Sequence, residues 1–367
     1  MFLSRMPGRA FRLLFLPGRR RRLQAWLRHR RALRMLALAE EDMRLGRCVA
    51  RTRPAYLVLD PGPVCNLRCR FCPTGNGEGS LAREFLAPDT FAKLVKNLPL
   101  DTLCEANLFN WGEPLLNPHL NAYIRFFADL GIQTVVHANF SARDYDDAWL
   151  EALVRSGLHR FVASVDGASQ ETYGAYRVGG DFDRVLRNLA GLVRARGRLG
   201  MTTPQVRYKM ILSRVNQHEV ETARQLAASA GAEFELQEVF GMPEAFREEW
   251  LSDSARERGG TGLVSAVDAG GHAPVPTECR QMWDTVVVNA NGDMHVCCQV
   301  HRPGCAVGNL LRDPFEEVWN GEKMRALRGF VLNGGPAPGF ENFCASCAFL
   351  CHAYRRAHGE SAGPRGT

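Results

Sequence analysis

Short apolar segments rich in β-branched residues alternate with helical patterns from residue 55 onward, and this rhythm limits the fold more than any other feature. Six segments have the length and composition of strands, at 56–60, 104–111, 133–139, 160–166, 206–213 and 233–240. Helical patterns lie between them near 88–98, 118–130, 144–156, 181–196 and 216–230, and three of these patterns end at Gly131, Gly157 and Gly231. Six β/α units predict a parallel sheet with crossover helices, and both an open sheet and a partial barrel fit that count.

Positive charge is concentrated at the N-terminus. The 367-residue chain has a formal net charge of +7, but residues 1–50 hold 13 arginines and three acidic residues, so they carry +10 and the remainder sums to −3. The body of the chain therefore gives no electrostatic reason to expect a nucleic-acid partner. Within a basic extension over 1–53, residues 20–43 have the pattern of an amphipathic helix. This helix could pack on the body with a solvated basic face, attach to a membrane surface, dock on an acidic partner or serve as a transit peptide.

Twelve cysteines stand in a chain with no evident secretory signal and no apolar run of the roughly 18 residues that a membrane span needs. A reducing, cytoplasmic compartment is expected, with peripheral membrane contact left open, and clustered cysteines there usually mean metal binding or catalysis. The densest motif is Cys65, Cys69 and Cys72 in the loop after the first strand. Zinc sites usually take four ligands from two separated pairs, whereas three thiolates within eight residues suit three corners of a [4Fe–4S] cube. Zinc and plain buried thiols are the alternatives.

The spacing of these three cysteines, with Phe71 directly before the last, resembles the defining motif of the radical S-adenosylmethionine (SAM) superfamily. The resemblance covers residues 55 to about 240 and implies a partial (β/α)6 barrel of the TIM-barrel type over residues 54–250. It also implies that S-adenosylmethionine binds the open iron and contacts polar groups at the carboxyl ends of the strands. The residues that match the family's cofactor contacts are Phe71, Gly112, Glu113, Pro114, Asn139, Ser164, Asp166 and Arg177.

The chemistry that the resemblance implies begins with reductive cleavage of S-adenosylmethionine to a 5′-deoxyadenosyl radical. That radical abstracts a hydrogen atom from substrate, while the protein positions the cofactor and excludes competing hydrogen donors. A flavodoxin- or ferredoxin-type protein is the expected source of the electron.

A second group of cysteines follows a Gly-, Ser- and Ala-rich stretch, residues 251–278, that we interpret as a linker or lid. Residues 279–358 also contain a predicted hairpin, with strands at 285–289 and 293–297 around Asn291-Gly292, and two short helices near 314–320 and 322–332. The tail, residues 359–367, is expected to be disordered. The cysteines of this region are Cys279, Cys297, Cys298, Cys305, Cys344, Cys347 and Cys351.

The spacing from Cys279 through Gly292 to Cys297, and the pair Cys344 and Cys347, resemble the C-terminal domain called SPASM or its shorter relative called twitch. Both hold auxiliary iron–sulfur clusters. The resemblance implies one auxiliary [4Fe–4S] cluster bound by those four cysteines. A zinc ribbon, Cys298 in place of Cys297, and ligand roles for the remaining cysteines stay open.

An auxiliary cluster with four protein ligands has no open iron, so its expected use is to accept an electron from the substrate radical. The net reaction would then be an oxidation, as in the dehydrogenases of this superfamily, and the substrate a small molecule or carbohydrate. Modification of a peptide or protein is the alternative within the superfamily. A nucleic-acid- or lipid-binding module with structural metal is the alternative outside it. Charged residues on the last two strands, Arg207, Lys209 and Glu238, are the candidates for substrate contact.

Overall fold

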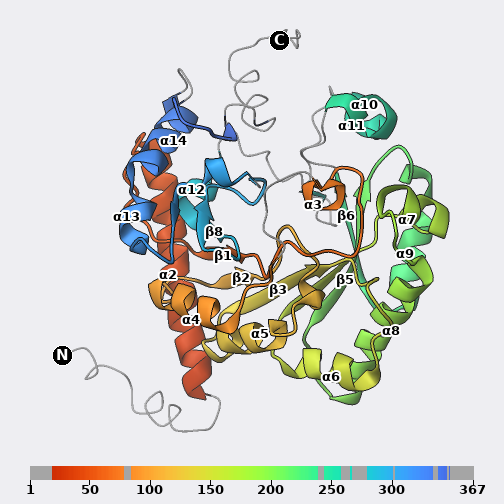
Figure 1. The fold of residues 1–367 in the computed structure, drawn as a ribbon. Helices are drawn as coiled ribbons and strands as arrows, with labels where there is room; N and C mark the ends of the chain where they lie inside the picture. The colour runs from red at the N-terminus through yellow and green to blue at the C-terminus, as the bar shows by residue number, and fades with distance from the viewer. Residues whose placement is uncertain are drawn as a thin grey trace.

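The computed structural model describes residues 19–77, 84–238, 244–257, 265–266, 279–300, 302–333, 338–344 and 347. Their strands form one mixed sheet in the order β10-β9-β8-β1-β2-β3-β4-β5-β6-β7 (Figure 1). In the described residues the edge strands β10 and β7 do not pair with each other, so the barrel is open. This agrees with the partial barrel that the family resemblance implies.

The centre of the sheet is parallel. Its strands are β1 Tyr56–Leu59, β2 Glu105–Asn107, β3 Gln133–Ala138, β4 Arg160–Ser164, β5 Gln205–Leu212 and β6 Glu233–Glu238. Each pairs in parallel with the next, which confirms all six predicted strands. The largest difference is at β2, which ends at Asn107 rather than at residue 111. There the chain leaves the sheet and packs against the loop after β1, where the Glu113 amide donates to the Val64 carbonyl at 2.8 Å.

Helices cover the outer face of these strands (Figure 1). They are α4 Pro88–Asn97, α5 Leu120–Asp129, α6 Asp147–Arg155, α7 Gln170–Tyr176, α8 Phe182–Arg198 and α9 Val220–Ser229. Shorter turns are α3 Pro73–Asn76, η2 Pro114–Leu116 and η3 Gln217–Glu219. The three glycines predicted to end helices, Gly131, Gly157 and Gly231, adopt positive φ values of 76°, 89° and 72°. Glycine tolerates that left-handed geometry because it has no Cβ.

The C-terminal segment continues the barrel sheet, which the sequence did not indicate. The predicted hairpin is present as β8 Thr285–Val288 and β9 Asp293–His295, and β8 pairs in parallel with β1. The remaining elements of this segment are α12 Gln281–Asp284, η4 Pro303–Cys305, β10 Gly308–Asn309, α13 Phe315–Trp319 and α14 Glu322–Asn333. Because β8 lies beside β1, the second cysteine group is anchored directly next to the strand that leads into the first.

The helix predicted at 20–43 is α2 Arg19–Arg44, which packs against α12 (Figure 1). Its Ala32 and Ala39 side chains are buried in the protein. The segment after it is equally fixed, because the Thr52 hydroxyl donates to the Trp283 carbonyl at 2.8 Å and its carbonyl accepts from the Trp319 indole at 2.7 Å. The outer side of α2 exposes Trp26 (50%) together with arginines. A packed helix with a solvated basic face describes this arrangement.

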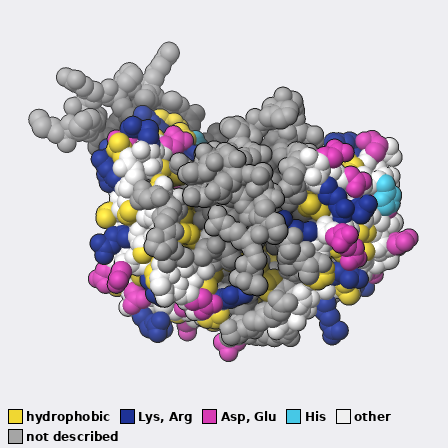
Figure 2. Space-filling model, turned by 90° about the horizontal axis from the view of Figure 1, so that it is seen from above, with side chains coloured by type: hydrophobic (Ala, Val, Ile, Leu, Met, Phe, Trp, Pro, Cys, Tyr) yellow, Lys and Arg dark blue, Asp and Glu magenta, His cyan; other side chains and the backbone are white. Residues whose placement is uncertain are grey.

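Part of the predicted linker is ordered. It contains α11 Asp253–Glu257 and β7 Ser265–Ala266, and α10 Glu244–Trp250 precedes it. Residues 258–264 and 267–278, and the predicted tail at 359–367, lie outside the described residues. Among the described helices, none is long and apolar enough to cross a membrane. Where described side chains are visible from above, acidic and basic groups alternate around the rim and form no large patch of one sign (Figure 2).

Candidate radical SAM site and auxiliary cluster site

The loop that carries Cys65, Cys69 and Cys72 is held against the end of α7. The backbone amide of Arg68 donates to the Val178 carbonyl at 2.9 Å, and the Arg70 guanidinium donates to the Ala175 carbonyl at 3.0 Å. A glycine in α3 allows close packing, because a Cβ on Gly75 would lie 2.7 Å from the Cys69 amide nitrogen. The loop is therefore braced on both sides of the motif.

Phe71 is the centre of an aromatic group. Its ring lies 5.4 Å from Tyr176, 4.7 Å from Phe246 and 5.1 Å from Trp250, measured between centroids. Such offset and edge-on contacts between aromatic rings stabilise the packing beyond the effect of the apolar area that they bury. Phe71 thus connects the cysteine loop to α7 and α10, in addition to the cofactor contact that the family resemblance implies for it.

The three thiols share one environment. Burial raises the pKa of Cys65 to about 12 and raises that of Cys69; Cys69 and Cys72 raise the pKa of Cys65 further, and Cys72 raises that of Cys69. Polar hydrogens nevertheless approach the sulfurs: the Leu67 amide lies 3.4 Å from Cys65 Sγ, and the Arg177 guanidinium lies 3.7 Å from Cys69 Sγ. Buried thiols with nearby donors fit iron, because the metal compensates the thiolate charge that burial otherwise penalises.

The arrangement is not that of a site for one ion. In the part of the chain that the structure describes, no three Cys, His, Asp or Glu side chains converge as ligands of a single metal ion. Each cysteine of a cubane cluster binds a different iron, so its sulfurs need not meet at one point. The donor set of three thiols on one braced loop fits the cluster.

The Gly112-Glu113-Pro114 segment crosses directly over the cysteine loop. A Cβ on Gly112 would lie 1.8 Å from the Gly62 carbonyl oxygen, so only glycine fits. Glu113 is 2% exposed, and its carboxylate accepts from the amides of Leu115 at 3.3 Å and Asn139 at 2.6 Å. Burial raises the pKa of Glu113 to about 7. A buried carboxyl that joins the ends of β2 and β3 is a suitable partner for a cationic amino group.

Asn139, at the end of β3, lies beside the first cysteine. Its amide nitrogen is 3.7 Å from Cys65 Sγ and 2.9 Å from the Asn66 side-chain oxygen, and its own oxygen accepts from the Ser141 amide at 2.8 Å. The amide nitrogen of Asn139 therefore fixes the cysteine loop relative to β3, and its oxygen fixes the start of the loop after β3.

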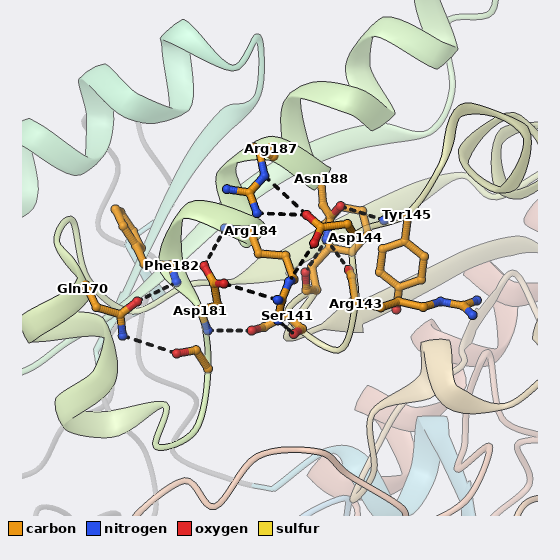
Figure 3. A network of polar contacts seen from close by, with 12 residues as sticks. Ser141, Arg143, Asp144, Tyr145, Gln170, Asp181, Phe182, Arg184, Arg187 and Asn188 are labelled. Atoms are coloured by element: carbon orange, nitrogen blue, oxygen red, sulfur yellow. Dashed lines mark hydrogen bonds and ion pairs between the residues drawn. The ribbon is translucent and has the colours of Figure 1, made fainter.

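A polar network fixes the loop after β3 (Figure 3). Asn188 on α8 points into this loop, where its amide nitrogen donates to the carbonyls of Phe140 and Arg143, both at 2.9 Å. Its oxygen accepts from the Tyr145 amide at 3.1 Å. Phe140 has a φ of 56°, which is uncommon for a bulky residue, so these bonds hold the loop in a conformation that it would not favour alone.

Asp166 and Arg177 form an ion pair next to the cysteines. The Arg177 Nε lies 2.7 Å from Asp166 Oδ2, while Asp166 Oδ1 accepts from the Ile211 amide at 2.6 Å. Asp166 adopts a φ of 64°. Ser164, also predicted as a cofactor contact, ends β4 and is buried. The structure therefore brings together residues from β1, β2, β3 and β4 that the sequence predicted as one site.

The three predicted substrate residues divide between two faces of the sheet. Arg207 forms ion pairs with Glu233 at 3.2 Å and Glu235 at 2.9 Å. Lys209 stands two residues further along β5 and therefore on the same, inner face. Glu238 pairs in register with Leu212, which is three residues from Lys209 along β5 and therefore on the other face. Its carboxylate accepts from the hydroxyls of Ser252, just before α11, and Ser254, at the start of α11. Glu238 holds that helix and does not lie on the face of Lys209.

The inner face also carries charged and aromatic residues that the sequence analysis missed. Arg160 on β4 forms an ion pair with Glu105 on β2 at 3.1 Å. His137 on β3 stacks on Phe109 with the ring centroids 3.9 Å apart. The sequence pattern that could have identified these residues is the period of two along each strand, which places every second residue on the inner face.

The described cysteines of the second group also lie near one another. Burial raises the pKa of Cys279 to about 11 and that of Cys344 to about 12, with Cys347 acting on both. The neighbouring Cys298 thiol, together with burial, raises the pKa of Cys297 well above its usual range. These mutual influences place Cys279 near Cys347, Cys297 and Cys298, and Cys344 near Cys279 and Cys347. Cys305 also acts on Cys344, and Cys351 lies outside the described residues.

One side chain connects the two sites. The Asn110 amide, in the orientation that satisfies both of its polar atoms, donates to the Cys298 carbonyl at 3.1 Å and accepts from the Trp111 indole at 3.0 Å. Asn110 is two residues before Gly112. The loop over the first cysteine motif therefore contacts the segment that holds the second.

Family comparison agrees with both cysteine sites. The family model of the radical SAM superfamily matches residues 59–223, and SPASM, an iron-sulfur cluster-binding domain, matches residues 279–348. The chain is a radical SAM protein with a C-terminal SPASM domain. Its cofactors are accordingly S-adenosylmethionine, the [4Fe–4S] cluster of the radical SAM domain and auxiliary iron–sulfur in the SPASM domain.

Individual relatives are distant. An AdoMet-dependent heme synthase of Methanosarcina barkeri (strain Fusaro / DSM 804) is 27% identical over 188 residues, which are 49% of this chain and 48% of the relative. The chain spans about half the length of the curated relatives that it matches. Among solved structures, Streptococcus suis SuiB bound to S-adenosylmethionine is 16% identical with a TM-score of 0.54, covering 81% of this chain and 71% of SuiB. Native anSMEcpe with AdoMet and a Cp18Cys peptide is 14% identical with a TM-score of 0.55, covering 82% and 95%. At these identities, the likeness concerns the fold.

Proposed function

We propose that this enzyme oxidises a polar small molecule or carbohydrate that lies on the inner face of the barrel, with the auxiliary cluster as electron acceptor. The observation that carries the proposal is the contact of Asn110 with the Cys298 carbonyl. This hydrogen bond joins the loop over the radical SAM site to the segment that holds the auxiliary site, so the two segments form one continuous wall. A substrate against this wall is near both the group that removes its hydrogen atom and the group that can take its electron.

The protein residues of the radical SAM site would bind and orient the cofactor. When bound there, S-adenosylmethionine supplies the radical that abstracts hydrogen. Glu113 would accept from the cofactor's amino group, and Asn139 and Ser164 would contact its polar atoms. Arg177 is already paired with Asp166, so this ion pair would act as a unit toward the cofactor's carboxylate and ribose. The family resemblance supports these roles, and so does their assembly beside the three cysteines.

For the auxiliary site, we propose one [4Fe–4S] cluster bound by Cys279, Cys297, Cys344 and Cys347. The electron for the first step would come from a flavodoxin- or ferredoxin-type protein. Modification of a peptide is the second candidate function. It is supported by the similarity of fold to SuiB, which has been solved with its precursor peptide SuiA, and to anSMEcpe with its Cp18Cys peptide.

The test begins with the protein reconstituted anaerobically and reduced with dithionite in the presence of S-adenosylmethionine. Release of 5′-deoxyadenosine is expected, and it should stop when Cys65, Cys69 and Cys72 are all replaced by alanine. Undiminished release by that triple variant would contradict the radical SAM site. Oxidation of substrate is then sought in cell extracts, separated into small-molecule and peptide fractions, as a mass loss of about two hydrogens that requires all four proposed auxiliary cysteines. A substrate product that forms equally without those cysteines would contradict the electron-acceptor role.

A further inference from the structure

Lysine is rare in this chain, and its positions are informative. Only four of the 46 basic side chains are lysines, namely Lys93, Lys96, Lys209 and Lys323. Lys93 and Lys96 are exposed on α4. Lys323 donates to the Ala306 carbonyl at 2.9 Å. Of the four, Lys209 alone lies on the inner face of the barrel. Because nearly all basic residues of this chain are arginines, a lysine at this position is unusual for the protein.

The arginines around Lys209 all have carboxylate partners. Arg160 pairs with Glu105, Arg177 with Asp166, and Arg207 with two glutamates of β6. In contrast, no acceptor in the described part of the chain lies within hydrogen-bonding or ion-pair distance of the Lys209 ammonium. The carboxylates that act on it most strongly, Asp166 and Glu235, are bound to those arginines instead.

Burial is the largest influence on Lys209 and lowers its pKa. Lys209 is half-buried, and an ammonium that loses part of its water without gaining a counter-charge is unfavourable. The remedy is either loss of the proton or binding of an anion. Across the strands Lys209 lies between Ser164 and Glu235, toward the carboxyl ends where the cofactor residues gather.

His137 faces the same region. It lies in register, through Val162 of β4, with Arg207, the residue two before Lys209 on β5. Its ring nitrogens form no hydrogen bond within the described ranges, although its ring stacks on Phe109. Burial lowers the pKa of His137, and the charge of Lys209 is the largest electrostatic contribution in the same direction. An anion near both side chains would relieve this repulsion.

We propose that Lys209 and His137 form a receptor for an anionic group, a carboxylate or a phosphate, on the substrate. The proposal rests on the proposed function, since it names the class of substrate for that site. Lysine suits this task because its ammonium binds phosphate or carboxylate oxygens as a point charge and does not impose the planar geometry of arginine. The substrate class is therefore an acidic or phosphorylated metabolite.

The test measures anion binding to the reconstituted, oxidised protein saturated with S-adenosylmethionine, so that the cofactor's own carboxylate is already in place. Inorganic phosphate and malonate are titrated separately by calorimetry at constant ionic strength. The wild type should bind at least one of them, and Lys209→Met should weaken that binding about tenfold or more, as loss of a principal charged contact implies. Lys93→Met, which removes an exposed lysine, is the matched control and should bind like the wild type.

Binding of phosphate alone would identify a phosphorylated substrate, and binding of malonate alone a carboxylate. The proposal is overturned if the wild type binds neither anion, or if Lys209→Met binds them as well as the wild type does. If Lys209→Met does not fold, acetylation of the four lysines in the wild type decides. Anion should then slow the labelling of Lys209 and leave Lys93 and Lys96 unchanged, and equal labelling overturns the proposal. Failure of the proposed function would be seen separately, as absence of 5′-deoxyadenosine release by the wild type.

Discussion

Replacing Asn188 by alanine should lower the free energy of unfolding by about 3 kcal/mol, because this side chain satisfies three backbone groups at once, two of them buried and one partly buried. Asn188 is 3% exposed, and it binds the carbonyls of Phe140 and Arg143 and the amide of Tyr145 (Figure 3). A typical hydrogen bond contributes about 1 kcal/mol net, and a buried group left without a partner costs about 1–3 kcal/mol. Three such groups give about 3–9 kcal/mol, and the expected loss of about 3 kcal/mol lies at the lower end of this range because the Arg143 carbonyl is only partly buried and water can enter the space that alanine leaves.

The measurement is urea unfolding of the protein without added cofactor, read as a change in midpoint at unchanged slope. The matched control is Arg187→Ala on the same helix. Arg187 pairs with Asp144 at 2.9 Å in the same loop, but the two side chains are 58% and 60% exposed. Such an exposed pair contributes little to stability, because water screens both charges. If Asn188→Ala destabilises no more than Arg187→Ala, the buried amide is not what holds the loop after β3, and the reasoning fails.

Four further predictions concern the two sites and the N-terminal helix. Iron analysis should give about eight irons per chain, and about four after the first three cysteines are replaced by alanine; a value near twelve would mean a second auxiliary cluster. Gly112→Ala should cost about 1–3 kcal/mol or more and reduce 5′-deoxyadenosine release, since its Cβ would lie 1.8 Å from a backbone oxygen, whereas Gly197→Ala, with nothing within 4 Å, should be tolerated in the same assays. Because the pKa of Glu113 is raised to about 7 in the folded protein, cofactor-free wild type should lose about 3 kcal/mol of stability as the pH rises from about 4.5 to 7, and Glu113→Gln should not show this loss in urea midpoints. Deletion of residues 1–50 should give insoluble protein, because α2 is partly buried in the protein; a folded 1–50 deletion that keeps its clusters but no longer sediments with anionic liposomes would instead support a membrane anchor.

The parts of the site that the sequence predicted depend on short-range chemistry. The spacing of Cys65, Cys69 and Cys72 is local, and the end of each strand is marked by a change from apolar to polar residues. Because the strands are parallel, residues at their carboxyl ends, such as Asn139 and Asp166, had to meet at one edge of the sheet. No knowledge of register was needed for that conclusion. The same holds for the hairpin around Asn291-Gly292, where the turn residues specify the pairing.

The parts that the sequence did not predict depend on pairing between distant segments. Nothing in the four residues of β8 distinguishes pairing with β1 from pairing elsewhere, since both strands are short and apolar. The contact between Asn110 and Cys298 follows from that pairing, and so does the adjacency of the two cysteine groups. A single sequence contains the composition of each strand but not the choice of partner.

The charged residues of the last strands illustrate the same limit at the level of side chains. Period two places Arg207 and Lys209 on one face of β5, and this much is visible in the sequence. Their roles separate only in three dimensions, where β6 supplies two carboxylates to Arg207 and none within bonding distance of Lys209. Glu238 differs again, because its register places it on the other face, against α11. A charge on a barrel strand therefore indicates a substrate contact only after the protein's own ion pairs have been assigned. On the described inner face, that assignment leaves Lys209 as the basic side chain without a carboxylate partner.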